Sequence, residues 1–127
     1  MSPGATVAAF IKAIERKDIE AAVAMASPEI SYENMPISPV VGREGLAQVL
    51  EMFLGSAHEV EWQIVTQYEI GDTVVNERLD RFQIGDGWLE LPIAGFFRID
   101  DDGLIELWRD YFDMGSYQRQ FTALTGG

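Results

Sequence analysis

Residues 73–99, TVVNERLDRFQIGDGWLELPIAGFFRI, decide the fold class of this 127-residue chain. Apolar and polar residues alternate along the segment with a period of two, which is typical of β-strands and not of helices. The Gly85-Asp86-Gly87 sequence interrupts the alternation and predicts a turn. The segment is therefore expected to form two antiparallel strands, over about 73–84 and 88–99.

The alternation begins after His58 and continues beyond the quoted segment, so that four strands are expected. The other two cover about 59–70 and 104–113, and the Gly-Asp pair at 71–72 and the acidic run at 100–103 supply the remaining turns. The acidic run lacks the regular ligand spacing of a calcium-binding loop, which favours a solvated hairpin turn.

The chain before His58 has helical periodicity instead. Ser2 followed by Pro3 predicts the start of a first helix, whose buried face is formed by Val7, Phe10, Ile11 and Ile14. A third helix is expected after Gly42, with one apolar side formed by Leu46, Val49, Leu50, Phe53 and Leu54. A short helix over about 116–123 is expected to close the chain.

Two shorter elements are expected between the first and third helices. Asp18 predicts the cap of a second helix, which runs through an alanine-rich stretch to about Ala26 and is closed by Pro28. Brief alternation over 30–35 then predicts a short strand that stops at Pro36.

Helices followed by a run of antiparallel strands indicate an α+β fold, here in a single domain over 1–127. We expect a strongly curved, mixed β-sheet whose concave face is covered by the N-terminal helices, which leaves a cone-shaped pocket between the layers. The strand after Asp72 has no cleanly apolar face, so it either lies at an edge or places polar groups in a cavity. One of its faces carries Val74, Asn76, Arg78, Asp80 and Phe82.

The charge and composition of the chain exclude several classes of partner. The net charge of −12 and nine scattered Lys and Arg residues argue against nucleic acid, because counterion release requires clustered cations. The acidity also favours a neutral substrate over an anionic one. The lack of cysteine excludes disulfides, zinc–thiolate sites and thiol nucleophiles. With no basic-then-apolar leader and no apolar run near the roughly 18 residues of a membrane span, a cytoplasmic protein without a membrane partner is expected.

The candidate chemistry lies in three short sequences: Tyr32-Glu33-Asn34, Arg78-Leu79-Asp80 and Trp108-Arg109-Asp110-Tyr111-Phe112-Asp113. In the first two, polar residues two positions apart project to the same face of a strand. In the third, Asp110 shares a face with Trp108 and Phe112. A carboxylate between two aromatic rings is not expected to point into bulk water.

Each of these sequences also has a purely structural interpretation. Arg78 and Asp80 are alternatively an ordinary ion pair on an exposed sheet face, worth about 0–1 kcal/mol. Asp110 is alternatively held only by Arg109 or by a backbone donor. The tyrosine of the first sequence is alternatively a core residue, and its asparagine the start of a turn. Taken one by one, the residues leave both interpretations open.

Together the three sequences resemble the limonene-1,2-epoxide hydrolase family, within the wider fold group of nuclear transport factor 2 and the SnoaL-like polyketide cyclases. The family pattern is Tyr-x-Asn, then Arg-x-Asp on a central strand, then an Asp inside Trp-Arg-Asp-Tyr-Phe-Asp. The last motif matches over all six residues, and the resemblance runs from the first helix to about Phe121. The pattern falls here on Tyr32, Asn34, Arg78, Asp80 and Asp110.

The resemblance implies a cofactor-free epoxide hydrolase, which opens a small apolar epoxide with water in one step and yields a vicinal diol. Asp110, with Tyr32 and Asn34, would hold a water and remove its proton. Asp80 would donate a proton to the epoxide oxygen, and Arg78 would bridge the two carboxylates. The family's limonene-cleaving member has a longer segment ahead of the first helix, whereas here that helix is expected to begin almost at residue 1.

Electrostatics supports one acidic and one basic aspartate independently of the resemblance. Asp80 must be protonated near neutral pH, although a free Asp titrates at about 3.9. Two carboxylates beside one arginine form a neutral site when they share a single proton, and burial disfavours the second negative charge. One carboxyl is then an acid and the other a base, and the titration belongs to the pair.

Two rival functions are open at this point. A ketosteroid-isomerase-like or SnoaL-like enzyme would move a proton next to a carbonyl, a task that needs no arginine-bridged pair of aspartates. In a non-catalytic small-molecule-binding module, Arg78, Asp80 and Asp110 would not converge in one enclosed pocket.

Two further expectations concern the rest of the surface. His58 opens a strand, so we expect it to be exposed and to have no catalytic role. We expect a homodimer through the sheet face that does not line the pocket, because the helices cover only the other face.

Overall fold

The computed structural model describes residues 1–35 and 37–126, and these residues form four helices and six strands. The helices are α1 (Pro3–Glu15), α2 (Ile19–Ala24), α3 (Arg43–Gly55) and α4 (Met114–Thr125). The strands are β1 (Ala26–Met35), β2 (Val40–Val41), β3 (Val60–Ile70), β4 (Thr73–Ile84), β5 (Gly87–Ile99) and β6 (Ile105–Tyr111).

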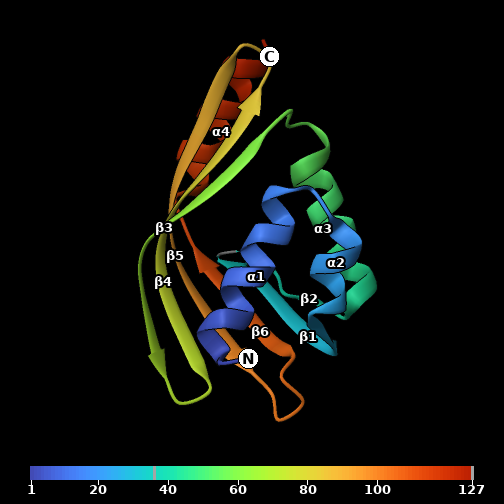
Figure 1. Cartoon of the computed structure of the whole chain (residues 1–127). Coiled ribbons are helices and arrows are strands. Elements are labelled where there is room, and N and C mark those ends of the chain that lie inside the picture. The colour runs from blue at the N-terminus through green and yellow to red at the C-terminus, as the bar shows by residue number, and fades with distance from the viewer. Residues whose placement is uncertain (36, 127) are drawn as a thin grey trace.

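The strands form one mixed sheet in the order β2-β1-β6-β5-β4-β3. β1 pairs with β6 in parallel, and the other neighbours pair antiparallel. The sheet bends, and α1, α2 and α3 lie together against one side of it (Figure 1). The expected α+β class with a mixed sheet and N-terminal helices on one face is confirmed.

The two long N-terminal helices form for the reasons that the sequence indicates. Ser2 Oγ accepts a hydrogen bond from the amide of Ala5 at 3.2 Å, and Pro3 occupies the first helical position. The predicted apolar face of α1 is buried, with Phe10 and Ile14 fully inaccessible. In α3 the buried positions are Leu46, Leu50 and Leu54.

The predicted boundary between the second helix and the first strand is wrong. α2 ends at Ala24, and Pro28 lies inside β1 rather than closing a helix. The reason is tertiary: β1 begins to pair with β6 at Ala26, and the pairing is irregular between Ala26 and Ser31. An irregular ladder tolerates proline, which has no N–H to donate. Pro36, expected to end this strand, lies outside the described residues.

The four strands predicted from alternation are β3 to β6, with ends that differ by at most two residues from those expected. The acidic run forms the expected turn, since Asp100 Oδ1 accepts hydrogen bonds from the amides of Asp102 and Leu104. The two-residue strand β2 was not predicted, because it is too short to show a period.

β4 is an internal strand, which decides between the two expectations for its mixed face. It lies between β3 and β5, and its polar side chains Asn76, Arg78 and Asp80 are each 1 % exposed. The sequence therefore places polar groups inside the protein. Within residues 1–35 and 37–126, no helix is long and apolar enough to cross a membrane.

Candidate active site

Arg78 is the centre of a buried polar cluster, and all five of its N–H groups have side-chain acceptors. Nε and Nη2 donate to the two oxygens of Asp80, each at 3.0 Å. Nη2 also donates to Asp110 Oδ2 at 2.8 Å, and Nη1 donates to Asp110 Oδ1 at 3.3 Å and to Asn76 Oδ1 at 3.0 Å. The guanidinium thus bridges the two carboxylates and has no N–H left for a ligand.

The register of the sheet brings these residues together. Arg78 and Asp80 come from β4 and Asp110 from β6, so β5 runs between them. At the crossing point β5 carries Gly95, which pairs with Asn76 on one side and with Asp110 on the other. A Cβ there would clash with Arg78 Nη1 and lie 2.7 Å from Asp110 Oδ1. The absence of a side chain at residue 95 is what lets Arg78 reach across β5.

Asp110 has a second donor, the indole of Trp108, whose Nε1 lies 2.9 Å from Asp110 Oδ1. The alternative that Asp110 is held only by its neighbour Arg109 is wrong, because Arg109 donates instead to Glu33 Oε1 at 2.7 Å. The alternative of an exposed Arg78–Asp80 pair is also wrong, since both side chains are at most 1 % exposed.

Tyr32 and Asn34 enter the cluster from β1, which lies beside β6. In the parallel register Tyr32 pairs with Trp108 and Asn34 with Asp110. Tyr32 is 3 % exposed, and its ring stacks on Trp108 with the centroids 4.1 Å apart. Asn34 is half-buried, and its backbone carbonyl accepts a hydrogen bond from the amide of Ile37.

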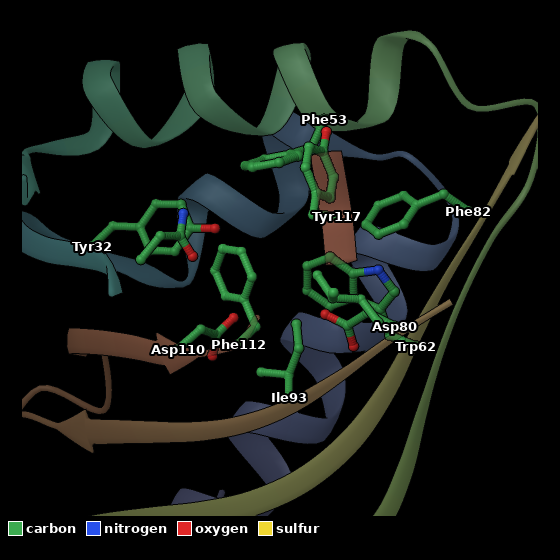
Figure 2. Close-up of a pocket in the computed structure, with 11 residues that line it drawn as sticks. Tyr32, Phe53, Trp62, Asp80, Phe82, Ile93, Asp110, Phe112 and Tyr117 are labelled. Atoms are coloured by element: carbon green, nitrogen blue, oxygen red, sulfur yellow. The ribbon is translucent and has the colours of Figure 1, made fainter. Parts of the chain in front are cut away.

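A pocket opens above the carboxylates, with an empty volume of about 300 Å³ that includes its opening to solvent. Figure 2 shows Asp80 and Asp110 on one side of it and the rings of Phe53 and Tyr117 on the opposite side. The predicted Tyr32, Asn34, Asp80 and Asp110 all line this pocket, together with Phe53, Trp62, Phe82, Leu91, Ile93, Phe112 and Tyr117. Arg78 lies behind the two carboxylates, so the structure brings all five predicted residues together.

Burial controls the protonation of the cluster. Burial raises the pKa of Asp80 to about 7 against the opposing effect of Arg78, and the negative charge of Asp110 adds to the rise. Burial and the charge of Asp110 also raise the pKa of the Tyr32 hydroxyl, which therefore stays protonated. For Arg78, burial opposes the charge, but the two carboxylates outweigh it and raise its pKa.

Several residues of the site were not selected from the sequence. Asn76 was expected on the same strand face as Arg78 but was not selected as a site residue. The period of two along the strand was sufficient to identify it. Gly95 and Trp62 depend on cross-strand register, with Trp62 paired to Asp80, and no short motif marks them. The indole Nε1 of Trp62 is buried without a hydrogen-bond partner among the described residues.

His58 is exposed, as expected, and lies outside the pocket lining. In the described part of the chain, no group of three or more His, Cys, Asp or Glu side chains is placed to hold a metal ion.

Solved structures with low sequence identity identify the class of fold. A protein with a ketosteroid isomerase-like fold from Catenulispora acidiphila, in complex with trimethylamine, superposes with a TM-score of 0.81 at 21 % identity, covering 94 % of this chain and 93 % of that one. A protein from Cytophaga hutchinsonii, of the nuclear transport factor 2-like type and of unknown function, has a TM-score of 0.76 at 17 % identity and covers 95 % and 96 %. The fold is therefore of the nuclear transport factor 2-like class, here with a buried Asp–Arg–Asp cluster in its pocket.

Within this class the chain belongs to the limonene-1,2-epoxide hydrolase family, whose catalytic-domain model matches residues 1–122. The epoxide hydrolase EphG of Mycobacterium tuberculosis is 33 % identical over 108 residues, which are 85 % of this chain and 71 % of that protein. The structure of an M. tuberculosis epoxide hydrolase similar to the family has a TM-score of 0.78 at 31 % identity and covers 94 % and 92 %.

Proposed function

We propose that this protein is an epoxide hydrolase that adds water directly to a small apolar epoxide and releases a vicinal diol. The observation that carries the proposal is the Arg78 bridge, in which one cation contacts two buried carboxylates that line the same pocket. One positive and two negative charges leave the cluster one proton short of neutrality. A single shared proton therefore gives one acid and one base.

Asp80 is assigned as the acid and Asp110 as the base. The pKa of Asp80 is raised to about 7, mainly by burial, so a large share of it is protonated at neutral pH. Asp110 is assigned as the base because its oxygens accept hydrogen bonds from Trp108 as well as from Arg78. Arg78 cannot protonate the substrate itself, because each of its N–H groups already has an acceptor.

The proposed reaction requires no cofactor, because every proton and bond in it is accounted for by water, the epoxide and the two aspartates. Asp110 removes a proton from water while the water oxygen attacks an epoxide carbon and the C–O bond breaks. The proton of Asp80 passes to the leaving oxygen, which becomes the second hydroxyl of the diol. Exchange with solvent returns the proton from Asp110 to Asp80. Ring strain supplies driving force, so the acid and the base suffice.

Tyr32 and Asn34 are assigned to hold the attacking water beside Asp110. Both line the pocket on the β1 side, and Asn34 is the cross-strand neighbour of Asp110. A protonated Tyr32 hydroxyl is able both to donate and to accept a hydrogen bond, and the raised pKa keeps it protonated.

The wall of the pocket favours a small apolar substrate. Five aromatic rings besides Tyr32 line it, from Phe53, Trp62, Phe82, Phe112 and Tyr117. Apolar walls with a few convergent polar groups are usual for small-molecule sites. Convergence of both carboxylates there supports an enzyme rather than a binding module.

A panel of epoxides tests the proposal: limonene oxide, cyclohexene oxide and styrene oxide, with diol formation followed by mass spectrometry. We expect diol from at least one epoxide, and a loss of roughly 10²-fold or more in Asp110→Asn. Asp101→Asn, which changes an exposed carboxylate in the turn between β5 and β6, is the matched control and should keep full activity. No diol above buffer background with any epoxide would contradict the proposal.

We also propose that the protein is a homodimer through the outer face of the sheet. Phe96 and Tyr111 form an edge-to-face pair 5.8 Å apart on this face and are 36 % and 44 % exposed. A second copy would bury them and leave the pocket free. Sedimentation at micromolar concentration should give a dimer, and Phe96→Glu should give a monomer. A wild-type protein that sediments only as a monomer would refute this part.

A further inference from the structure

Trp108 lies behind the pocket wall, where it touches two of the residues assigned to the attacking water. It is fully buried and does not line the pocket. Its indole Nε1 donates to Asp110 Oδ1 at 2.9 Å, and its ring stacks on Tyr32 at an interplanar angle of 13°. One side chain thus contacts both the base and the tyrosine.

The two oxygens of Asp110 are not equivalent because of this contact. Arg78 donates one hydrogen bond to each of them, at 3.3 Å for Oδ1 and 2.8 Å for Oδ2. Trp108 donates to Oδ1 only. A carboxylate oxygen has two lone-pair sites, so Oδ1 is saturated, whereas Oδ2 keeps one acceptor site free among the described residues.

We propose that Trp108 is a positioning residue, which presents Oδ2 of Asp110 as the oxygen that takes the proton of water and holds Tyr32 in line with it. The inference rests on the proposed function, since it assigns the working atom of the same base. Trp108 itself contacts neither the attacking water nor the substrate in the proposed reaction.

The surroundings of Trp108 fix its orientation. Phe10 from α1 meets its ring edge-on, with centroids 5.1 Å apart and an interplanar angle of 89°. Phe97 from β5 stacks on it at 5.8 Å and 15°. With Tyr32 these rings enclose the indole, so its N–H cannot turn away from Asp110 without repacking the core.

Trp108→Phe removes the N–H and keeps an aromatic ring. We expect kcat to fall about 10- to 100-fold, the equivalent of one hydrogen bond to a charged group, with a much smaller change in KM. The charged and titratable groups that face Asp110 are otherwise unchanged: Arg78 and Asp80 from β4, Tyr32 from β1, and Glu15 of α1, which acts on Asp80.

Phe10→Leu is the matched control, because it removes one aromatic contact of the same indole but no hydrogen bond. It should lower the melting temperature as Trp108→Phe does and leave kcat close to that of the wild type. A folded Trp108→Phe with the kcat of the wild type would overturn the inference and leave the proposed function standing. A wild type that hydrolyses no epoxide overturns both.

A measurement on the indole itself covers the case in which Trp108→Phe does not fold. In ¹⁵N–¹H spectra of the wild type, the Trp108 indole N–H should be shifted downfield and exchange slowly, with assignment by Trp62→Phe and Trp88→Phe. In Asp110→Asn it should move upfield, because its acceptor loses the charge. If the indole resonance does not change position in Asp110→Asn, the hydrogen bond from Trp108 to Asp110 is absent and the inference is wrong.

Discussion

Gly95→Ala tests the geometry of the site with a change that adds no charge and removes no functional group. The new Cβ would clash with Arg78 Nη1 and lie 2.7 Å from Asp110 Oδ1 and 3.1 Å from Asn76 Oδ1. Ordinary van der Waals contact with a Cβ begins near 3.4 Å. Asp110 Oδ1 must therefore move by about 0.7 Å, and Arg78 Nη1 must move further. The guanidinium is not a free side-chain end, because five hydrogen bonds hold it.

Two effects of different size follow from this displacement. Overpacking of a buried site costs about 1–3 kcal/mol, which lowers Tm by roughly 3–15 °C in a chain of this size. A misplacement of about 1 Å in a catalytic group costs about 10²-fold in rate. We therefore expect a folded Gly95→Ala protein whose kcat for its best epoxide is about 100-fold reduced.

Gly87→Ala is the matched control, because it makes the same substitution on the same strand. Its Cβ would lie 2.5 Å from Leu124 Cδ2, the end of a flexible side chain that is able to rotate away. Thermal melts and epoxide turnover on the same preparations separate the two variants. Wild-type turnover by Gly95→Ala would refute the claim that Arg78 must cross β5 to reach Asp110.

Two further substitutions test the acid and the base. Asp110→Asn keeps the shape of the base, so activity should fall by about 10²–10⁴-fold while Tm changes little, and a folded variant with near wild-type turnover would exclude Asp110 as the base. Asp80 has a folded-state pKa of about 7, above its value of about 3.9 in the unfolded chain, so its contribution to stability is lost as pH rises between these values. Calorimetry should accordingly show a wild type that loses up to about 4 kcal/mol between pH 4 and pH 8 from this group, and an Asp80→Asn variant with a flatter profile; parallel profiles would contradict the raised pKa.

The fold class could be predicted from the sequence because its two signals are local. Period-two alternation marked β3 to β6, and helical spacing with the Ser2 cap marked α1. The boundary at Ala26 failed because the start of β1 is set by pairing with β6, which lies almost eighty positions away in sequence. Local propensity contains no information about such a contact.

The difference between local signals and long-range contacts also decides which parts of the candidate site could be predicted. Arg78 and Asp80 are two residues apart on one strand, so their common face follows from the pleat. Their meeting with Asp110 needs the register of three strands and the lack of a side chain at Gly95. The hydrogen bond from Trp108 to Asp110 was within reach of sequence reasoning, since the two share a strand face. The place of Trp62 in the pocket lining was not, because Trp62 comes from β3.

In the proposed reaction water adds directly to the epoxide, and a single turnover in oxygen-18 water tests this step. With enzyme in excess over an epoxide, direct addition predicts one labelled oxygen in every diol formed and no label in Asp80 or Asp110. A covalent aspartyl ester would instead place an unlabelled carboxylate oxygen in the first diol and leave the label in the protein. Unlabelled diol from the first turnover, with label in the peptide that carries Asp110, would rule out direct addition of water.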